Sequence, residues 1–141
     1  MKNCIFCRII KGELPSSNVY EDEYLLAFMD VQPVNKGHVL IVPKNHAELV
    51  SEMKKETLGK MMVVAGKINS AIRKSKIKCE GINFLLADGQ AAGQSVFHAH
   101  LHVVPRFKND GFGFKFPKGY ENKPDRNELG RLAKKIRFIL Q

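Results

Sequence analysis

A run of alternating histidines constrains the fold of this chain more than any other feature. Residues 97–105 read Phe-His-Ala-His-Leu-His-Val-Val-Pro, so that His98, His100 and His102 occupy every second position. In an extended chain, residues two apart point to the same face. The run therefore predicts a β-strand with the histidines in a row on one face, about 6.7 Å apart at a rise of ~3.3 Å per residue, and apolar side chains on the other.

Such a row of imidazoles points to chemistry rather than to packing alone. The chain has five histidines, and three of them fall within five residues. A mononuclear hydrolytic metal site usually adds a carboxylate or a further histidine, and the following Val103–Arg106 segment offers neither. A neutral imidazole can act as a nucleophile without special activation, because its ordinary pKa is about 6.5. We therefore favour nucleophilic catalysis over pure metal binding.

A glycine-containing turn precedes the histidines and suggests the electrophile. Gly89, Gly93, Gln94 and Ser95 lie just before His98. Turns of this kind present backbone N–H groups and small polar side chains to an anion. A phosphate held there would lie beside the histidines.

Five further positions are candidates with open alternatives. Cys4 and Cys7 have the spacing of half a zinc site or of a redox pair, and His46 is a candidate further ligand. His38 follows a glycine at the start of a strand, where a structural role is the usual one. Asp30 follows a strand and is placed either to accept two sugar hydroxyls or to stabilise a turn.

Composition narrows the class of protein. At 141 residues with 44% hydrophobic content, one domain is expected, and no stretch approaches the ~20 apolar residues of a membrane span. The start of the chain lacks an apolar signal region and the three cysteines are few, so we expect a cytoplasmic protein without a membrane partner. The net charge of +9 favours anionic partners. Nucleic acid is disfavoured, because the basic residues are spread along the chain without interleaved stacking aromatics.

The order of expected elements indicates an α+β fold with an antiparallel sheet. Strands are predicted over residues 19–21, 24–29, 38–42 and 82–87, besides the histidine strand. A helix is predicted from near Thr57, with an apolar face of Met61, Ala65, Ile68 and Ile72. A last helix is predicted after a capping pair at Asp125 and Glu128, with an apolar stripe of Leu129, Leu132, Ile136 and Leu140. Residues 111–119 are predicted to be irregular.

Together these segments resemble the histidine-triad (HIT) superfamily, and most closely its bacterial HINT-like branch. The resemblance rests on Cys4–Ile10, Val19–Asp22, Leu26–Asp30, Gly37–His46 and Gly93–Arg106, and so covers about residues 3–107. It implies an α+β, HIT-like fold with a five-stranded antiparallel sheet, one long central helix, a C-terminal helix and a homodimeric assembly. We expect residues 1–141 to form a single HIT domain, in which residues 108–141 have no motif to indicate their role.

The resemblance also implies a reaction. It is a nucleotide phosphoramidase or nucleotidyl hydrolase that cleaves at the α-phosphate of purine nucleoside phosphoramidates or adenylated compounds, through a covalent nucleotidyl-histidine. His100 would be the nucleophile and His102 would hydrogen-bond the phosphate. Ser95 and Gln94 would contact the phosphate or leaving group, and His38 would support the histidines.

Binding residues are implied in the same way. Asp30 would hold the ribose of an AMP-like purine nucleotide, and the base pocket would be walled by Phe6, Ile9, Phe28, Val31 and Leu40. In zinc-containing relatives the ligands correspond to Cys4, Cys7, His46 and His98. We therefore expect a structural Zn²⁺, and no metal is needed for the chemistry itself.

One departure keeps two alternatives open. Many relatives carry an asparagine that contacts the phosphate or leaving group where this chain has Ala87, so that either Asp88 or a backbone group substitutes for it, or catalysis is weaker. The first alternative is a dinucleoside polyphosphate hydrolase, for which the basic segment 115–123 would serve the second nucleotide. The second is a nucleotide-binding regulatory dimer with residual activity.

Overall fold

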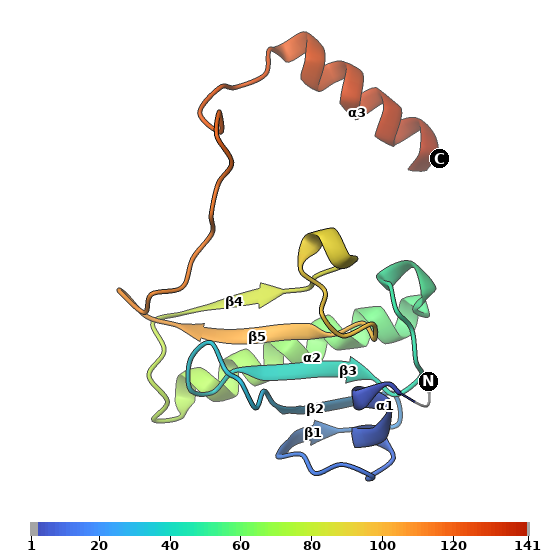
Figure 1. Ribbon diagram of the computed structural model, residues 1–141, viewed down its shortest axis with the longest axis vertical. Helices are drawn as coiled ribbons and strands as arrows, with labels where there is room; N and C mark the ends of the chain where they lie inside the picture. The colour runs from blue at the N-terminus through green and yellow to red at the C-terminus, as the bar shows by residue number, and fades with distance from the viewer. Residues whose placement is uncertain (1–2, 141) are drawn as a thin grey trace. The chain divides into compact units, whose positions relative to one another are not determined.

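The computed structural model describes residues 3–140, and the chain divides into two compact units, residues 1–111 and 112–141 (Figure 1). The first unit contains a sheet, two α-helices and two short 3₁₀ turns at residues 50–52 and 90–92. Its elements are α1 (Ile5–Ile10), β1 (Asn18–Glu21), β2 (Leu25–Met29), β3 (Val39–Pro43), α2 (Lys55–Lys74), β4 (Gly81–Leu85) and β5 (Leu101–Arg106). The second unit contains α3 (Arg126–Leu140).

The sheet has five strands in the order β1-β2-β3-β5-β4, and every neighbouring pair is antiparallel. The predicted α+β class with a five-stranded antiparallel sheet is therefore confirmed. Because β5 inserts between β3 and β4, the segment that carries the histidines enters the middle of the sheet. Side chains of β5 can therefore face the elements packed on either side of the sheet.

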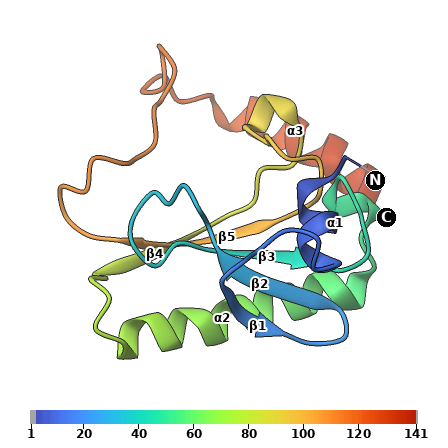
Figure 2. The same cartoon turned by 60° about the horizontal axis from the view of Figure 1, so that its bottom comes forward.

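A different helix packs on each face of the sheet, α2 on one and α1 on the other (Figure 2). On one face, alternate residues of β2, β3 and β5 pack with the apolar face of α2, as the period of two in the strands requires. This cluster contains Leu25, Ala27, Val39, Ile41, Leu101, Val103, Met61, Val64, Ala65, Ile68 and Ile72. On the other face, Phe6 of α1 packs with Leu26, Phe28, Leu40 and Val42. His102 pairs with Leu40 across the β3–β5 ladder and so belongs to the α1 face.

The predicted histidine strand is wrong in its extent. β5 begins at Leu101, so that His102 lies in the strand while His98 and His100 precede it. The reason is the carbonyl of Pro43, at the end of β3, which accepts a hydrogen bond from Nε2 of His98 at 2.8 Å. Pairing between β3 and β5 is limited to Val39–Ile41 and Leu101–Val103.

Other boundaries differ by a few residues, and one helix was not predicted. Residues 5–10 form α1, whose N-cap is Cys4: its Sγ accepts the backbone N–H of Cys7 at 3.4 Å. α2 begins at Lys55, two residues before the predicted start, and β4 spans 81–85 rather than 82–87. The spacing of Cys4 and Cys7, one helical turn, was the available signal for α1.

The second unit, taken by itself, is an irregular segment followed by a helix. Asp125 Oδ1 accepts the backbone N–H of Glu128 at 2.8 Å, so the predicted cap at the start of α3 is present. The predicted apolar stripe of α3 is exposed along its length, at Leu129, Leu132, Ile136 and Leu140. Phe116 stacks on Tyr120 with ring centroids 4.1 Å apart. Among residues 3–140, no helix is both long and apolar enough to cross a membrane.

Candidate functional site

A cavity of about 280 Å³ opens on the α1 face of the sheet, where α1, β2, β3 and β5 meet. It contains all six residues predicted to bind the nucleotide, together with three of the residues predicted to act on it: Phe6, Ile9, Phe28, Asp30, Val31, Leu40, Ser95, His100 and His102. Ile5 also lines it, and sequence reasoning missed this residue because α1 was not recognised. Val31 is 97% exposed and therefore lies at the rim.

Hydrogen bonding leaves His100 with a free lone pair on one nitrogen. Its Nδ1 lies 2.7 Å from the backbone oxygen of His98, which can only accept, so Nδ1 carries the proton. Nε2 is then the unprotonated nitrogen. Burial lowers the pKa of His100, which is 4% exposed, although Asp30 acts in the opposite direction. A neutral imidazole with its lone pair on Nε2 lines the cavity, and this is the form that a nucleophile needs.

A chain of hydrogen bonds also assigns the protons of His38 and His102. The backbone N–H of Val34 donates to Nδ1 of His38 at 3.1 Å, so the proton of neutral His38 is on Nε2. That proton points to Nδ1 of His102, 2.8 Å away. His102 must therefore carry its own proton on Nε2. Burial, with His100 and His38 nearby, lowers the pKa of His102 to about 4, and burial also lowers the pKa of His38.

Asp30 combines the two roles that its sequence position left open. Its Oδ1 accepts the backbone N–H of Gln32 at 2.8 Å, which stabilises the turn after β2. Its Oδ2 lies 3.5 Å from Nε2 of His38, and the residue lines the cavity. Lone pairs of this carboxylate remain available to accept hydroxyl groups of a ligand.

The side chain of Gln94 holds the glycine-containing turn together by hydrogen bonds. Gly89 and Gly93 both have positive φ, at 103° and 93°, a conformation that favours glycine. Gln94 is 3% exposed, and its side chain accepts from the N–H of Gly89 and donates to the carbonyl oxygens of Glu48 and Val96. Its amide is thus engaged within the protein, which differs from the predicted contact with phosphate. Ser95 is exposed at the cavity.

Asp88 and Ala87 stand beside this turn. Asp88 Oδ1 accepts the backbone N–H of Val50 at 2.8 Å, so one carboxylate oxygen holds the 50–52 turn. Ala87 is partly buried and brings no polar group. The structure therefore gives Asp88 a local structural contact at the place where a phosphate contact was expected.

A second group of side chains has the composition of a zinc site. The sulfur atoms of Cys4 and Cys7 and Nδ1 of His46 and His98 all lie within 4.8 Å of one another. Nδ1 of His98 lies 3.1 Å from Nδ1 of His46, 3.4 Å from Sγ of Cys4 and 3.5 Å from Sγ of Cys7. A tetrahedral Zn²⁺ with bonds of about 2.0–2.3 Å separates its ligands by about 3.3–3.8 Å, so the donor set fits.

The protons of His98 support the same interpretation. Because Nε2 of His98 donates to the Pro43 carbonyl, Nδ1 carries a lone pair and faces Nδ1 of His46. Ligating histidines commonly donate their other N–H to a carbonyl in this way. Burial raises the pKa of the Cys7 thiol, and the neighbouring Cys4 raises it further. A bound cation would therefore be needed to hold Cys7 as a thiolate near neutral pH.

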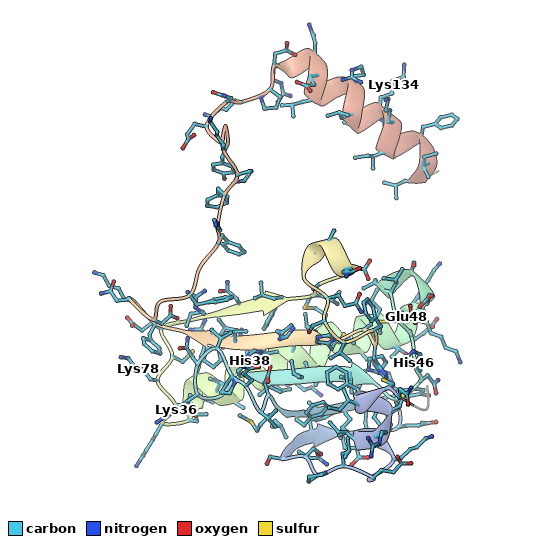
Figure 3. All side chains as sticks on the ribbon, viewed as in Figure 1. Lys36, His38, His46, Glu48, Lys78 and Lys134 are labelled. Atoms are coloured by element: carbon cyan, nitrogen blue, oxygen red, sulfur yellow. The ribbon has the colours of Figure 1, made fainter. Side chains whose placement is uncertain are left out.

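Asp30, His38 and His102 also lie close enough to bind a metal ion. Their hydrogen bonds argue against it. Metal at Nε2 of His38 would leave that ring with no proton, because Nδ1 already accepts from Val34. The two groups are separate in space: Figure 3 shows His38 and His46 beyond opposite ends of β3.

Comparison with known proteins agrees with this geometry. The family model of the HIT domain matches residues 11–109, so the chain belongs to the HIT domain family. "Protein hit" of Bacillus subtilis is 50% identical over 113 residues, which cover 79% of this chain and 77% of that protein. "Adenylylsulfatase HINT3" of Arabidopsis thaliana is 38% identical over 108 residues, 77% of this chain and 54% of that longer protein.

Solved structures extend the comparison. SMU.412c from Streptococcus mutans superposes with a TM-score of 0.90 at 40% identity, over 100% of this chain and 87% of that one. A histidine triad nucleotide-binding protein from Candida albicans gives a TM-score of 0.86 at 33% identity, over 98% and 97%. A Zn-bound histidine triad family protein from Mycobacterium smegmatis gives 0.76 at 40% identity, over 93% and 90%. The fold is thus that of a family with nucleotide-binding hydrolases and transferases.

Proposed function

We propose that this protein is a nucleotide phosphoramidase or nucleotidyl hydrolase that acts at the α-phosphate of purine nucleoside phosphoramidates or adenylated compounds. One observation carries the proposal: a single cavity is lined by a neutral His100 with a free Nε2 lone pair, by His102 with a proton on Nε2, and by the Asp30 carboxylate. The names of the Candida nucleotide-binding protein and the Arabidopsis adenylylsulfatase are in keeping with it.

The residues divide the reaction into two displacements. Nε2 of His100 attacks the α-phosphorus, the P–N bond of the phosphoramidate breaks, and the amine leaves after taking a proton from solvent. Water then attacks the same phosphorus and gives a proton back to solvent, the P–Nε2 bond breaks, and the nucleoside monophosphate is released with His100 restored. Nε2–H of His102 and the hydroxyl of Ser95 would stabilise the developing charge on the phosphoryl oxygens.

Other residues would bind and orient the nucleotide. Asp30 would accept the ribose hydroxyls, while Phe6, Ile9, Phe28 and Leu40 would enclose the base, with Val31 at the rim. His38 would hold His102 through the hydrogen bond between them. Gln94, whose amide is engaged within the turn, would support the phosphate site by fixing the backbone at Gly89.

We propose a structural role for zinc at Cys4, Cys7, His46 and His98. The ligands join α1 to the segment after β3 and to the segment before β5, so a bound ion would cross-link three parts of the first unit. His98 also supplies the carbonyl that fixes the proton of His100. The metal would thus organise the site, while the reaction itself proceeds on His100.

A second copy of the chain would cover the edge of the sheet at β4, as a homodimer. β4 lies at one end of the strand order. Beside it, Met62 and Phe84 are 54% and 36% exposed and line an open cavity of about 610 Å³. Exposed sheet edges with apolar surroundings favour pairing with another chain. Light scattering after size-exclusion chromatography would measure the mass, and Phe84→Lys is expected to shift it toward that of one chain.

The test of the reaction compares substrates and a nucleophile variant. The wild-type protein is expected to hydrolyse an adenosine 5′-phosphoramidate faster than a diadenosine polyphosphate, and His100→Asn is expected to lose the activity. Acid quench of the wild-type reaction would trap nucleotidyl-protein. Equal rates for wild type and His100→Asn would reject the proposed nucleophile, and binding of AMP without turnover of either substrate would favour a regulatory role.

A further inference from the structure

The proton on His102 depends on a backbone group that sequence analysis does not identify. The backbone N–H of Val34 fixes the tautomer of His38, and His38 in turn fixes that of His102. Val34 lies in the 32–38 segment, a turn between β2 and β3. What holds this segment in place therefore decides whether His102 presents a donor or an acceptor to the phosphate.

Asn35 anchors this segment to the far end of β5. Its Nδ2 donates to the carbonyl oxygen of Pro105 at 2.8 Å and to Oδ2 of Asp110 at 2.8 Å. Its backbone oxygen accepts the N–H of His38 at 3.1 Å, which closes the turn. A single side chain thus connects the turn that carries the Val34 N–H to the strand that carries His102.

Asp110 is held rigidly behind Asn35. Its side chain is 2% exposed, and Arg106 donates to both of its oxygens, from Nε at 2.6 Å and from Nη2 at 2.9 Å. Arg106 also donates to Oδ1 of Asn83 on β4 at 2.6 Å. The anchor is therefore a bidentate ion pair with a buried carboxylate and a partly exposed guanidinium group, and its two hydrogen bonds fix the orientation of Asp110.

The turn also fits its surroundings closely at Gly37. This residue has φ +95°, and a Cβ there would lie 2.9 Å from Cγ2 of Ile77 and 3.2 Å from Cγ of Pro105. Backbone and side-chain constraints therefore converge on one conformation of the segment. A segment held in one conformation can keep the Val34 N–H directed at Nδ1 of His38.

We propose that Asn35, braced by Asp110 and Arg106, is a positioning residue that sets the tautomer of His38 and thereby keeps the Nε2 proton of His102 directed to the phosphate. Without the Val34 N–H, His38 could carry its proton on Nδ1 and accept at Nε2. His102 would then donate from Nδ1 and present a lone pair at Nε2. A lone pair facing a phosphoryl oxygen repels the charge that a donor would stabilise.

The groups that face His38 are consistent with this control. Asp30, His100 and His102 surround its ring, and the contact of Nε2 with Asp30 Oδ2 at 3.5 Å is longer than the 2.8 Å contact with His102. Asp30 favours a proton on Nε2 as well, so it works in the same direction as Val34. The hydrogen bonds of Asn35 therefore add to an existing preference for a proton on Nε2 of His38. Their removal should weaken this preference and lower the rate without abolishing catalysis.

The direct test is the protonation state of the ring nitrogens. Full-length, zinc-loaded protein labelled with ¹⁵N-histidine contains five imidazoles, for which long-range ¹H–¹⁵N correlations report the protonated nitrogen. In the wild type, His38 and His102 are expected to carry their protons on Nε2. Asn35→Ala is expected to shift both rings toward Nδ1, whereas Lys36→Ala, an exposed neighbour in the same turn, should leave them unchanged.

Kinetics supply the second readout, and only this consequence rests on the proposed function. Loss of one donor to transition-state charge costs up to about 10²–10³ in kcat, so a partial tautomer shift in Asn35→Ala should lower kcat by about 10- to 100-fold with KM changed less than about threefold. Asn35→Asp, which keeps the shape of the side chain but removes both N–H donors, should lower kcat at least as much as Asn35→Ala.

Several outcomes would overturn the inference. One is a wild-type His38 protonated on Nδ1, a result that needs no variant to fold. Others are unchanged tautomers in Asn35→Ala, or a loss confined to KM. If wild type hydrolyses none of the substrates while the tautomers respond as expected, the proposed function fails and the positioning role stands.

Discussion

Two pairs of histidine nitrogens face each other at similar distances, yet they have opposite chemistry. Nδ1 of His98 and Nδ1 of His46 are 3.1 Å apart, and Nε2 of His38 and Nδ1 of His102 are 2.8 Å apart. In the first pair, Nε2–H of His98 donates to the Pro43 carbonyl, so that the lone pair on Nδ1 of His98 faces His46. In the second pair the Val34 N–H keeps a proton between the rings.

The comparison shows that backbone partners, more than proximity, decide which ring nitrogens carry protons in the proposed metal group and in the proposed catalytic group. The lone pair on Nδ1 of His98 can accept a cation or a proton, whereas the proton on Nε2 of His38 already satisfies Nδ1 of His102. Two thiols complete the first group, and a carboxylate accompanies the second.

Replacing the nucleophile should abolish catalysis while leaving the metal group intact. His100→Asn is expected to lower kcat for a nucleoside phosphoramidate by at least about 10⁴-fold, because no other group in the cavity offers a free imidazole lone pair. Steady-state hydrolysis measures the loss. Zinc content measured by mass spectrometry should stay at the wild-type level, and a parallel loss of zinc would contradict the division.

Removing a metal ligand should give the reverse pattern. Cys7→Ser is expected to lose bound zinc and to lower the free energy of unfolding by about 3 kcal/mol or more, which lowers Tm by about 10 °C, because the ion cross-links three segments. Thermal unfolding with and without a chelator measures it. The chelator should destabilise the wild type and have little further effect on Cys7→Ser; an equal response of both proteins would contradict the metal site.

Changing the carboxylate should separate ligand binding from metal binding. Asp30→Asn is expected to raise KM for the nucleotide by about 10-fold, since it weakens the acceptor for the ribose hydroxyls by roughly 1.4 kcal/mol. Bound zinc should remain at one equivalent per chain in the wild type and in Asp30→Asn. A second equivalent in the wild type that disappears in Asp30→Asn would show that Asp30, His38 and His102 bind metal after all.

Acid should weaken the catalytic group through its neutral histidines. The pKa of His102 is lowered to about 4 in the folded protein, against about 6.5 when unfolded, so the unfolded chain binds more protons in between. Stability is therefore fully present above pH 6.5 and is lost as the pH falls toward 4. We expect His102 to contribute about 2 kcal/mol less to the free energy of unfolding at pH 5 than at pH 7.

Urea unfolding at several pH values measures this dependence. His102→Gln is the matched variant, and its loss of stability over the same interval should be smaller by about that amount. An identical pH dependence in both proteins would mean that the pKa of His102 is the same in the folded and the unfolded chain. This would contradict the lowering of that pKa by burial and by the neighbouring histidines.

Much of the fold could be predicted from local patterns. The spacing of Met61, Ala65, Ile68 and Ile72 predicted which face of α2 meets the core, and the structure has these side chains there. The residue at which the histidine strand begins could not be predicted in this way. Alternation predicted a strand from the first histidine, whereas Pro43, 55 residues away, holds His98 outside the ladder.

The site was predictable as a set of residues and not as a set of roles. The predicted nucleotide residues line one cavity and the predicted zinc ligands form one group. Gln94 differs, because its polarity suggested a ligand contact while burial commits its amide to Gly89, Glu48 and Val96. Asn35 and Asp110 lie 75 residues apart and gave no pattern that a sequence could reveal.

The sequence by itself determined the α+β class, the residues that face the core, and a histidine-rich segment next to a glycine-containing turn. Those properties follow from periodicity and from residue type, both of which are local. Only the tertiary structure decided which ring nitrogen carries the proton in each buried histidine. Partners such as Pro43 and Val34 control those protons only when folding places their backbone atoms against the rings.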